Sequence, residues 1–124
     1  MANTFKVVTF AAEPNSAGTP YDIYTASASG SGVTTVVLGL ILTNINTAQV
    51  TAEVELVSDT GSRGGSNDVT NGTAFLAKDI PIPVGSSVEL LSGNKVVLET
   101  TDQIRIDCSV ADKLSGALSV MEIT

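Results

Sequence analysis

Apolar residues recur at every second position in short runs along most of this chain. In QVTAEVEL (residues 49–56), Val, Ala and Leu alternate with Thr and Glu. Side chains of a β-strand point alternately to its two faces, so this pattern predicts a strand with one buried and one solvated face. No segment keeps an apolar stripe at helical spacing for three turns.

Runs of the same kind are rich in Val, Ile and Thr and are separated by Gly, Asn, Ser and Pro. The expected strands cover residues 4–10, 20–26, 33–43, 50–56, 73–80, 86–91, 95–99, 102–110 and 116–123. Many short strands with closely spaced turn signals predict an all-β fold. We therefore predict one domain, residues 1–124, that forms an antiparallel β-sandwich of about eight strands, Ig-like or jelly-roll-like. A closed barrel is the alternative.

Three connections carry turn-forming residues. Ser92-Gly93-Asn94 predicts a hairpin between the expected strands 86–91 and 95–99, because Gly and Asn tolerate positive φ. Residues 58–72 form a long Gly/Ser/Asn loop, which we expect either to be mobile or to become ordered against a partner. Residues 1–32 include a possible extended arm, in the stretch AAEPNSAGTP.

One expected strand, residues 33–43, is apolar on both faces. Strict alternation places Val37 and Ile41 on one face, and a second set of apolar residues on the other. A strand of this kind needs a cover on each side, supplied either by this chain or by a second subunit. Together with Arg63 of the long loop, the second set is the candidate interface: Val36, Leu38, Leu40, Leu42 and Arg63.

Composition excludes several classes of function. The formal net charge of −7 argues against binding to nucleic acid or to an anionic membrane surface. The chain has no histidine, which removes Ser-His-Asp and Cys-His catalysis and most zinc or iron sites. Cys108, the single cysteine, falls among the apolar positions of its run, so we expect a buried thiol. No catalytic, cofactor-binding or metal-binding residue is predicted.

The chain offers no segment for membrane insertion or export. Its longest apolar run, residues 36–42, is far below the ~18 residues that span a bilayer. The N-terminal apolar patch is too short for a secretory signal. We expect synthesis in a cytoplasm and a protein that stays in solution.

Asp59-Thr60-Gly61 follows a strand, as the catalytic turn of an aspartic protease does. In a short chain the second carboxylate would come from a dimer mate. However, Ser58 stands where the protease pattern has an apolar residue, and no hydrophobic pair followed by Gly braces the turn downstream. Asp, Thr and Gly are also common turn residues, so we predict a turn and keep a dimeric protease as a remote alternative.

Other acidic and aromatic residues give no clear site. Glu53 and Glu55 lie two apart on one strand, which predicts a solvated face rather than a glycosidase pair. Five aromatic residues are few for an Ig-like or carbohydrate-binding surface module, which stays a second alternative.

The second half of the chain resembles small virion structural proteins of tailed bacteriophages, of the marine phage and cyanophage type. The resemblance is carried by KDIPIPVGSSVELL (78–91), KVVLETTDQIRI (95–106) and LSVMEIT (118–124). It covers about residues 33–124, with loop 58–72 longer than is usual in that group.

This resemblance implies a non-enzymatic protein built into the virion. It would act as a capsid decoration (cement) protein, or alternatively as a neck or tail component. Its implied partners are other copies of itself and a phage capsid, neck or tail protein. No cofactor is implied.

Overall fold

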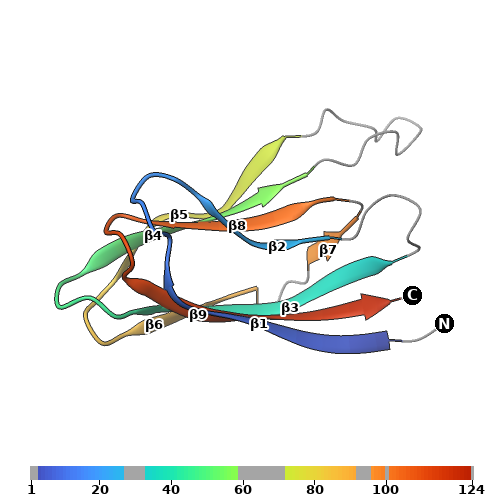
Figure 1. Cartoon of the computed structure of the whole chain (residues 1–124), viewed down its shortest axis with the longest axis horizontal. Helices are drawn as coiled ribbons and strands as arrows, with labels where there is room; N and C mark the ends of the chain where they lie inside the picture. The colour runs from blue at the N-terminus through green and yellow to red at the C-terminus, as the bar shows by residue number, and fades with distance from the viewer. Residues whose placement is uncertain (1–2, 27–32, 59–71, 92–95, 100, 124) are drawn as a thin grey trace.

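The structure is a computed structural model that describes residues 3–26, 33–58, 72–91, 96–99 and 101–123. Two β-sheets pack face to face (Figure 1). The strands are β1 (Asn3–Glu13), β2 (Tyr21–Thr25), β3 (Thr34–Asn44), β4 (Val50–Val57), β5 (Thr73–Ile82), β6 (Ser87–Leu90), β7 (Val96–Leu98), β8 (Gln103–Cys108) and β9 (Leu114–Ile123). Each expected strand overlaps an observed one, and the predicted all-β antiparallel sandwich is confirmed.

The strand order is that of a jelly roll. Sheet A has the order β1-β9-β3-β6, with β7 also paired to β3, and sheet B has the order β2-β8-β4-β5. The pairs are nested along the chain: β1 with β9, β2 with β8, β3 with β6 and β7, and β4 with β5. Rolling up one long antiparallel ribbon produces this nesting. Of the two predicted topologies, Ig-like and jelly-roll-like, the structure therefore has the jelly-roll one.

β6 and β7 are not the two arms of a hairpin, so the hairpin prediction at Ser92-Gly93-Asn94 is wrong. Both strands pair antiparallel with β3, β6 at Leu40–Thr43 and β7 at Thr35–Val37. They therefore run in the same direction and form one interrupted edge strand. Gly and Asn suit an interruption as well as a tight turn, and β3 supplies both strands with hydrogen-bond partners. Residues 92–95 lie outside the described residues.

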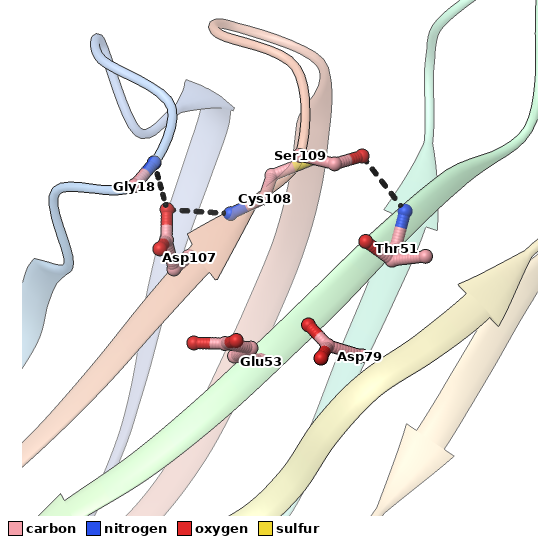
Figure 2. A pocket seen from close by; sticks show the side chains of 7 residues that line it. All are labelled: Gly18, Thr51, Glu53, Asp79, Asp107, Cys108 and Ser109. Carbon is pink, nitrogen blue, oxygen red and sulfur yellow. Dashed lines mark hydrogen bonds between the residues drawn. The ribbon is translucent and has the colours of Figure 1, made fainter.

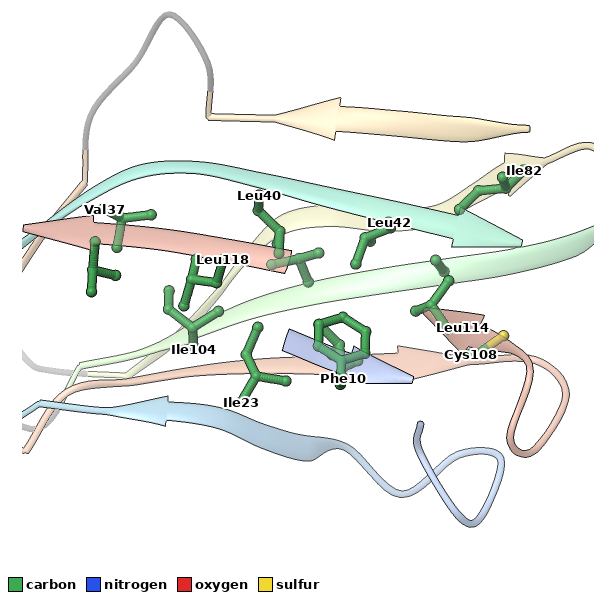
Figure 3. Packing of buried hydrophobic residues seen from close by; sticks show 14 of the residues in the cluster. Phe10, Ile23, Val37, Leu40, Leu42, Ile82, Ile104, Cys108, Leu114 and Leu118 are labelled. Atoms are coloured by element: carbon green, nitrogen blue, oxygen red, sulfur yellow. The ribbon is translucent and has the colours of Figure 1, made fainter. Parts of the chain in front are cut away.

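The core lies between the sheets and is almost entirely aliphatic (Figure 3). Cys108 is 2% exposed and packs within it, so the predicted buried thiol is confirmed. The fully buried large side chains come from both sheets: Leu40, Leu42, Ile82, Leu98, Ile104, Ile106, Leu114, Leu118, Val37, Val50, Val54 and Val120. Phe10 covers Gly116 on the neighbouring strand, where an added Cβ would collide with the ring and with the Ile41 carbonyl.

A β-bulge in β3 overturns the face assignment made from alternation. Val37 pairs with Val120 and Gly39 with Ser119, so Leu38 is an extra residue. Before the bulge Val37 points inward, and after it Leu40 and Leu42 do. Both faces of β3 are apolar, as predicted, but Leu40 and Leu42 belong to the core rather than to the face that carries Val36 and Leu38.

Residues 3–26 do not extend as an arm. β1 and β2 form edge strands of the two sheets, and the connection between them is fastened to the sandwich. The Gly18 amide donates to Asp107 Oδ1 at 3.1 Å, and the Asp112 amide donates to the Pro14 carbonyl at 2.8 Å. A segment rich in turn formers can thus be held by backbone hydrogen bonds, which a composition argument does not reveal.

Polar side chains link the sheets at the end of the sandwich where β1 begins. The Tyr24 hydroxyl donates to Glu122 Oε2 at 2.7 Å and lies 2.9 Å from the Thr35 hydroxyl. Lys6 Nζ lies 2.8 Å from Glu122 Oε1. The hydrogen bond with Lys6, and then that with Tyr24, lowers the pKa of Glu122, whereas burial raises the pKa of Tyr24.

Candidate functional site

The outer face of sheet A carries apolar side chains on four of its strands, β1, β9, β3 and β7. The register aligns Phe5 of β1 with Met121 of β9, Val36 of β3 and Val97 of β7. Because residues directly opposite one another share a face, these four side chains form one row across the sheet. We call this surface the apolar face, and its residues are Phe5, Val7, Val36, Leu38, Ile41, Val97, Ala117 and Met121.

Much of the apolar face is open to solvent. Phe5 is 70% exposed, Val7 62%, Val97 53% and Ile41 41%. Glu89, opposite Ile41 on β6, is the acidic residue that borders it. Shallow hollows lie on either side of Ser119 in this sheet. Exposed apolar side chains gathered on one face of a sheet are typical of a site of protein–protein contact.

The outer face of sheet B has the opposite chemistry. Five carboxylates and two cations gather on it, and we call it the acidic face: Asp22, Glu53, Glu55, Asp79, Asp107, Lys78 and Arg105. Arg105 Nε donates to Asp22 Oδ1. Glu55 is only 8% exposed, between Phe75 and Arg105 on the flanking strands, so the prediction of a solvated face is wrong for this residue.

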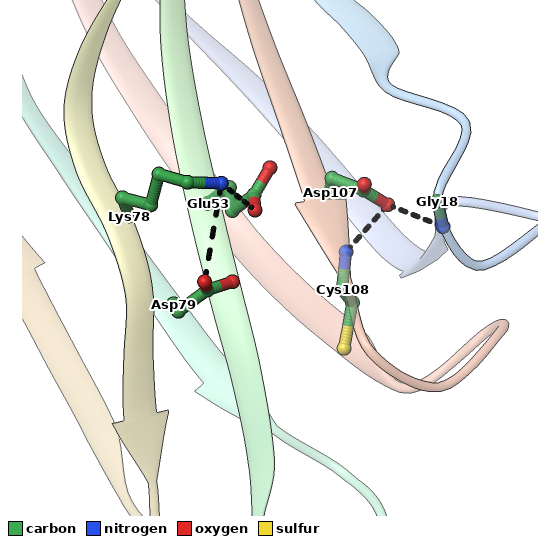
Figure 4. A network of polar contacts seen from close by, with 6 residues as sticks. All are labelled: Gly18, Glu53, Lys78, Asp79, Asp107 and Cys108. Carbon is green, nitrogen blue, oxygen red and sulfur yellow. Dashed lines mark hydrogen bonds and ion pairs between the residues drawn. The ribbon is translucent and has the colours of Figure 1, made fainter.

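A hollow of about 190 Å³ opens on the acidic face among Glu53, Asp79 and Asp107 (Figure 2). The carboxylates already have partners (Figure 4). Lys78 Nζ lies 2.9 Å from Glu53 and 3.9 Å from Asp79, and the hydrogen bond with Glu53 raises the pKa of Lys78. Asp107 Oδ1 accepts backbone N–H groups from Gly18 and, at 2.8 Å, from Cys108. Across the described ranges no group of three His, Cys, Asp or Glu side chains is placed to hold a metal ion.

The candidate interface divides between surface and core. Val36 and Leu38 lie on the apolar face, whereas Leu40 and Leu42 are 1% and 0% exposed. Arg63, most of loop 58–72 and the Asp59-Thr60-Gly61 turn lie outside the described residues.

Sequence reasoning missed Phe5, Val7, Val97 and Met121 as members of a surface. A signal for the phase change in β3 was present, since Gly39 inside a strand pattern suggests a bulge. No local sequence pattern predicts that β1, β9, β3 and β7 become neighbours in one sheet.

The exposed aromatic residues do not assemble into a sugar-stacking platform within the described ranges. Phe5 is on the apolar face of sheet A, whereas Phe75 is 50% exposed on sheet B. Lys78 Nζ lies 4.6 Å from the centre of the Phe75 ring. Tyr21, 41% exposed, lies on β2 at the other edge of sheet B.

Comparison with solved structures finds this fold in virus particles. One match is a chain of the T13 IBDV viral particle, with a TM-score of 0.53 and 13% identity, covering 97% of this chain and 30% of that one. Another is a chain of infectious bursal disease virus strain Gx, with a TM-score of 0.50 and 15% identity, covering 96% of this chain and 32% of that one. This chain thus spans about a third of theirs, and the likeness is one of fold.

No protein-family model and no curated protein matches the sequence. Among the described residues, no helix is long and apolar enough to cross a membrane.

Proposed function

We propose that this protein is a non-enzymatic structural component of a tailed-phage virion, most simply a capsid decoration protein. In this role it acts through contacts between subunits and with a shell protein. The observation that carries the proposal is the apolar face, where β1, β3 and β7 present exposed Phe, Val and Ile side chains around a single row that also includes Met121 of β9.

Three further observations support an assembly role. The jelly roll is a fold of viral capsid domains, although fold alone does not establish function. The two matched solved structures are of virus particles. The acidic face carries five carboxylates, two of them in close ion pairs with Lys78 and Arg105, which suits a surface that stays in solvent while the apolar face is covered.

Incorporation into virions tests the proposal with two matched variants. Ile41→Lys places an ammonium on the apolar face opposite Glu89, and Phe75→Lys places one on the acidic face opposite Glu55. Each new charge meets a carboxylate on the adjacent strand, so both variants should fold. We expect Ile41→Lys to reduce the amount of protein in purified virions at least tenfold, and Phe75→Lys to leave it unchanged. Equal incorporation of both variants would contradict the role of the apolar face.

Copy number separates the capsid from the neck or tail. Quantitative mass spectrometry of purified virions gives the ratio of this chain to the major shell protein. A decoration protein is expected in a fixed stoichiometric ratio to the shell protein, whereas a neck or tail component is expected at a small ring number per particle. Absence of the chain from virions would reject the proposed function altogether.

A further inference from the structure

β1 is a long edge strand that pairs, among the described strands, with β9 alone. Proteins usually protect such edges, because a row of free N–H and C=O groups can template pairing with another chain. The other edges of this molecule have that protection. β5 contains Pro81 and two register shifts, β2 is only five residues long, and β6 and β7 form an interrupted strand.

The outer edge of β1 carries none of these devices over Asn3–Phe10. Its pairing with β9 is regular there, and the register shifts only between Phe10 and Glu13. Lys6 is the single charge in this stretch, and it forms an ion pair with Glu122 of the same molecule. Phe5 and Val7 are the two most exposed large hydrophobic side chains among the described residues, and both lie on this strand.

We infer that β1 pairs antiparallel with β1 of a second copy, about a two-fold axis through Val7. This inference deepens the proposed function, on which it rests, by naming the partner of one edge of the apolar face. In a symmetric antiparallel pair, opposite residues share a face. The two-fold axis must therefore lie midway between two copies of the same residue, so that this residue is opposite itself. An axis at Lys6 would set two ammonium groups opposite one another, which is unfavourable.

An axis at Val7 fits the strand best. It pairs all of Thr4–Phe10 with itself, which is the regular stretch as far as the register shift. Val7 then meets Val7 of the partner subunit, Phe5 meets Thr9 and Lys6 meets Val8. The two A sheets become one continuous sheet, and their apolar faces merge into a single surface with the Phe5 and Val7 side chains at its centre.

Charge favours this contact over one through sheet B. The chain carries a net charge of −7, and its acidic face would meet an identical acidic face across a two-fold axis. Pairing through β1 leaves both acidic faces in solvent, and it also gives hydrogen-bond partners to the outer edge of β1, which no other described strand pairs.

Cysteine cross-linking tests the register. The native Cys108 is buried, so an introduced thiol is the reactive one. Directly opposite residues have Cα atoms about 4.5–5.5 Å apart, within the range of a disulfide. We expect Val7→Cys to form a disulfide-linked dimer on mild oxidation. Thr9→Cys alone should not, because two copies of Thr9 would be four residues apart along the strands, roughly 13 Å. The double variant Phe5→Cys/Thr9→Cys should cross-link.

A charge variant tests the edge against the rest of the apolar face. Val7→Lys places two ammonium groups opposite each other, and we expect the dimer dissociation constant, measured by analytical ultracentrifugation, to rise at least tenfold. Val97→Lys makes the same change at the far edge of sheet A and should leave it unchanged. Thermal melts of both variants check that they fold. A dimer that Val97→Lys disrupts and Val7→Lys does not would overturn the inference.

The two proposals fail separately. A chain that is incorporated into virions but gives no Val7→Cys dimer overturns the β1 pairing and leaves the structural role standing. A chain that cross-links through Val7→Cys but is absent from virions rejects the proposed function and leaves the pairing standing.

Discussion

The two outer faces of this sandwich are both formed by alternate residues of their strands, but their chemistry is opposite. On sheet A the outward positions are Phe, Val, Leu, Ile, Ala and Met among Ser, Thr and Gly, and Glu89 is the acidic residue at the border. On sheet B they gather five carboxylates and two cations. The inward positions of both sheets are alike, because both must build one aliphatic core. The outward positions are free of that demand, so their chemistry can differ between the two sheets.

Several charged groups of the acidic face have partners within the chain. Asp22 pairs with Arg105, Glu53 pairs with Lys78, and Asp107 accepts two backbone N–H groups. In the part of the chain that the structure describes, nothing comparable covers Phe5 or Val7 on the apolar face. Several polar groups of the acidic face thus have partners within the chain, whereas the described residues leave Phe5 and Val7 of the apolar face open to solvent.

The largest expected loss of stability comes from the core side of β3, and the outer side of the same strand gives the matched control. Leu40→Ala should lower the free energy of unfolding by about 3 kcal/mol, because it leaves a cavity in the core. Leu38→Ala, at the bulge and on the apolar face, should cost about 1 kcal/mol or less. Chemical denaturation measures both. Equal losses would mean that the bulge does not separate the two leucines as described.

Asp107→Ala should have the next largest effect, on the acidic face. It removes the acceptor of the Gly18 and Cys108 amides, and leaving such donors unpaired costs about 1–3 kcal/mol. Asp107→Asn keeps a carbonyl oxygen at the same place and should recover most of the loss. If Asn fails to recover it, the negative charge rather than the hydrogen bonds is what matters.

Glu122→Gln should have a smaller, pH-dependent effect. The fold lowers the pKa of Glu122, so its contribution is present above the unfolded pKa of ~4.3 and is lost as pH falls through the folded pKa. We expect the variant to lose about 0.5–1 kcal/mol at pH 7, since Lys6 is half exposed, and the difference from the wild type to vanish in acid. Denaturation at several pH values measures this. A loss that does not change with pH would exclude the ion pair as its cause.

Lys78→Gln should have the smallest effect. Lys78 is exposed, and its contacts with Glu53 and the Phe75 ring are surface interactions. We expect no measurable change in the denaturation midpoint at neutral pH. A clear loss of stability would show that the acidic face needs the charge of Lys78 to hold Glu53, Glu55 and Asp79 together.

The secondary structure was largely predictable because strand alternation is a local signal. QVTAEVEL and its counterparts mark where each strand lies, and turn formers mark the ends. The bulge at Leu38 was not predicted, since one added residue reverses the phase of all that follows it. The prediction of a hairpin at residues 92–94 was wrong for a related reason. A turn signal does not say with which strand each flanking strand pairs, and here both pair with β3.

By itself, the sequence determined that this chain is an all-β sandwich with an aliphatic core and an acidic charge. It also indicated that the β3 region needs a cover on both faces. Only the tertiary structure decided the jelly-roll order, the split of Leu40 and Leu42 from Val36 and Leu38, and the assembly of the apolar face. Each of these depends on pairing between strands distant in the chain, such as β1 with β9, whereas periodicity describes one strand at a time.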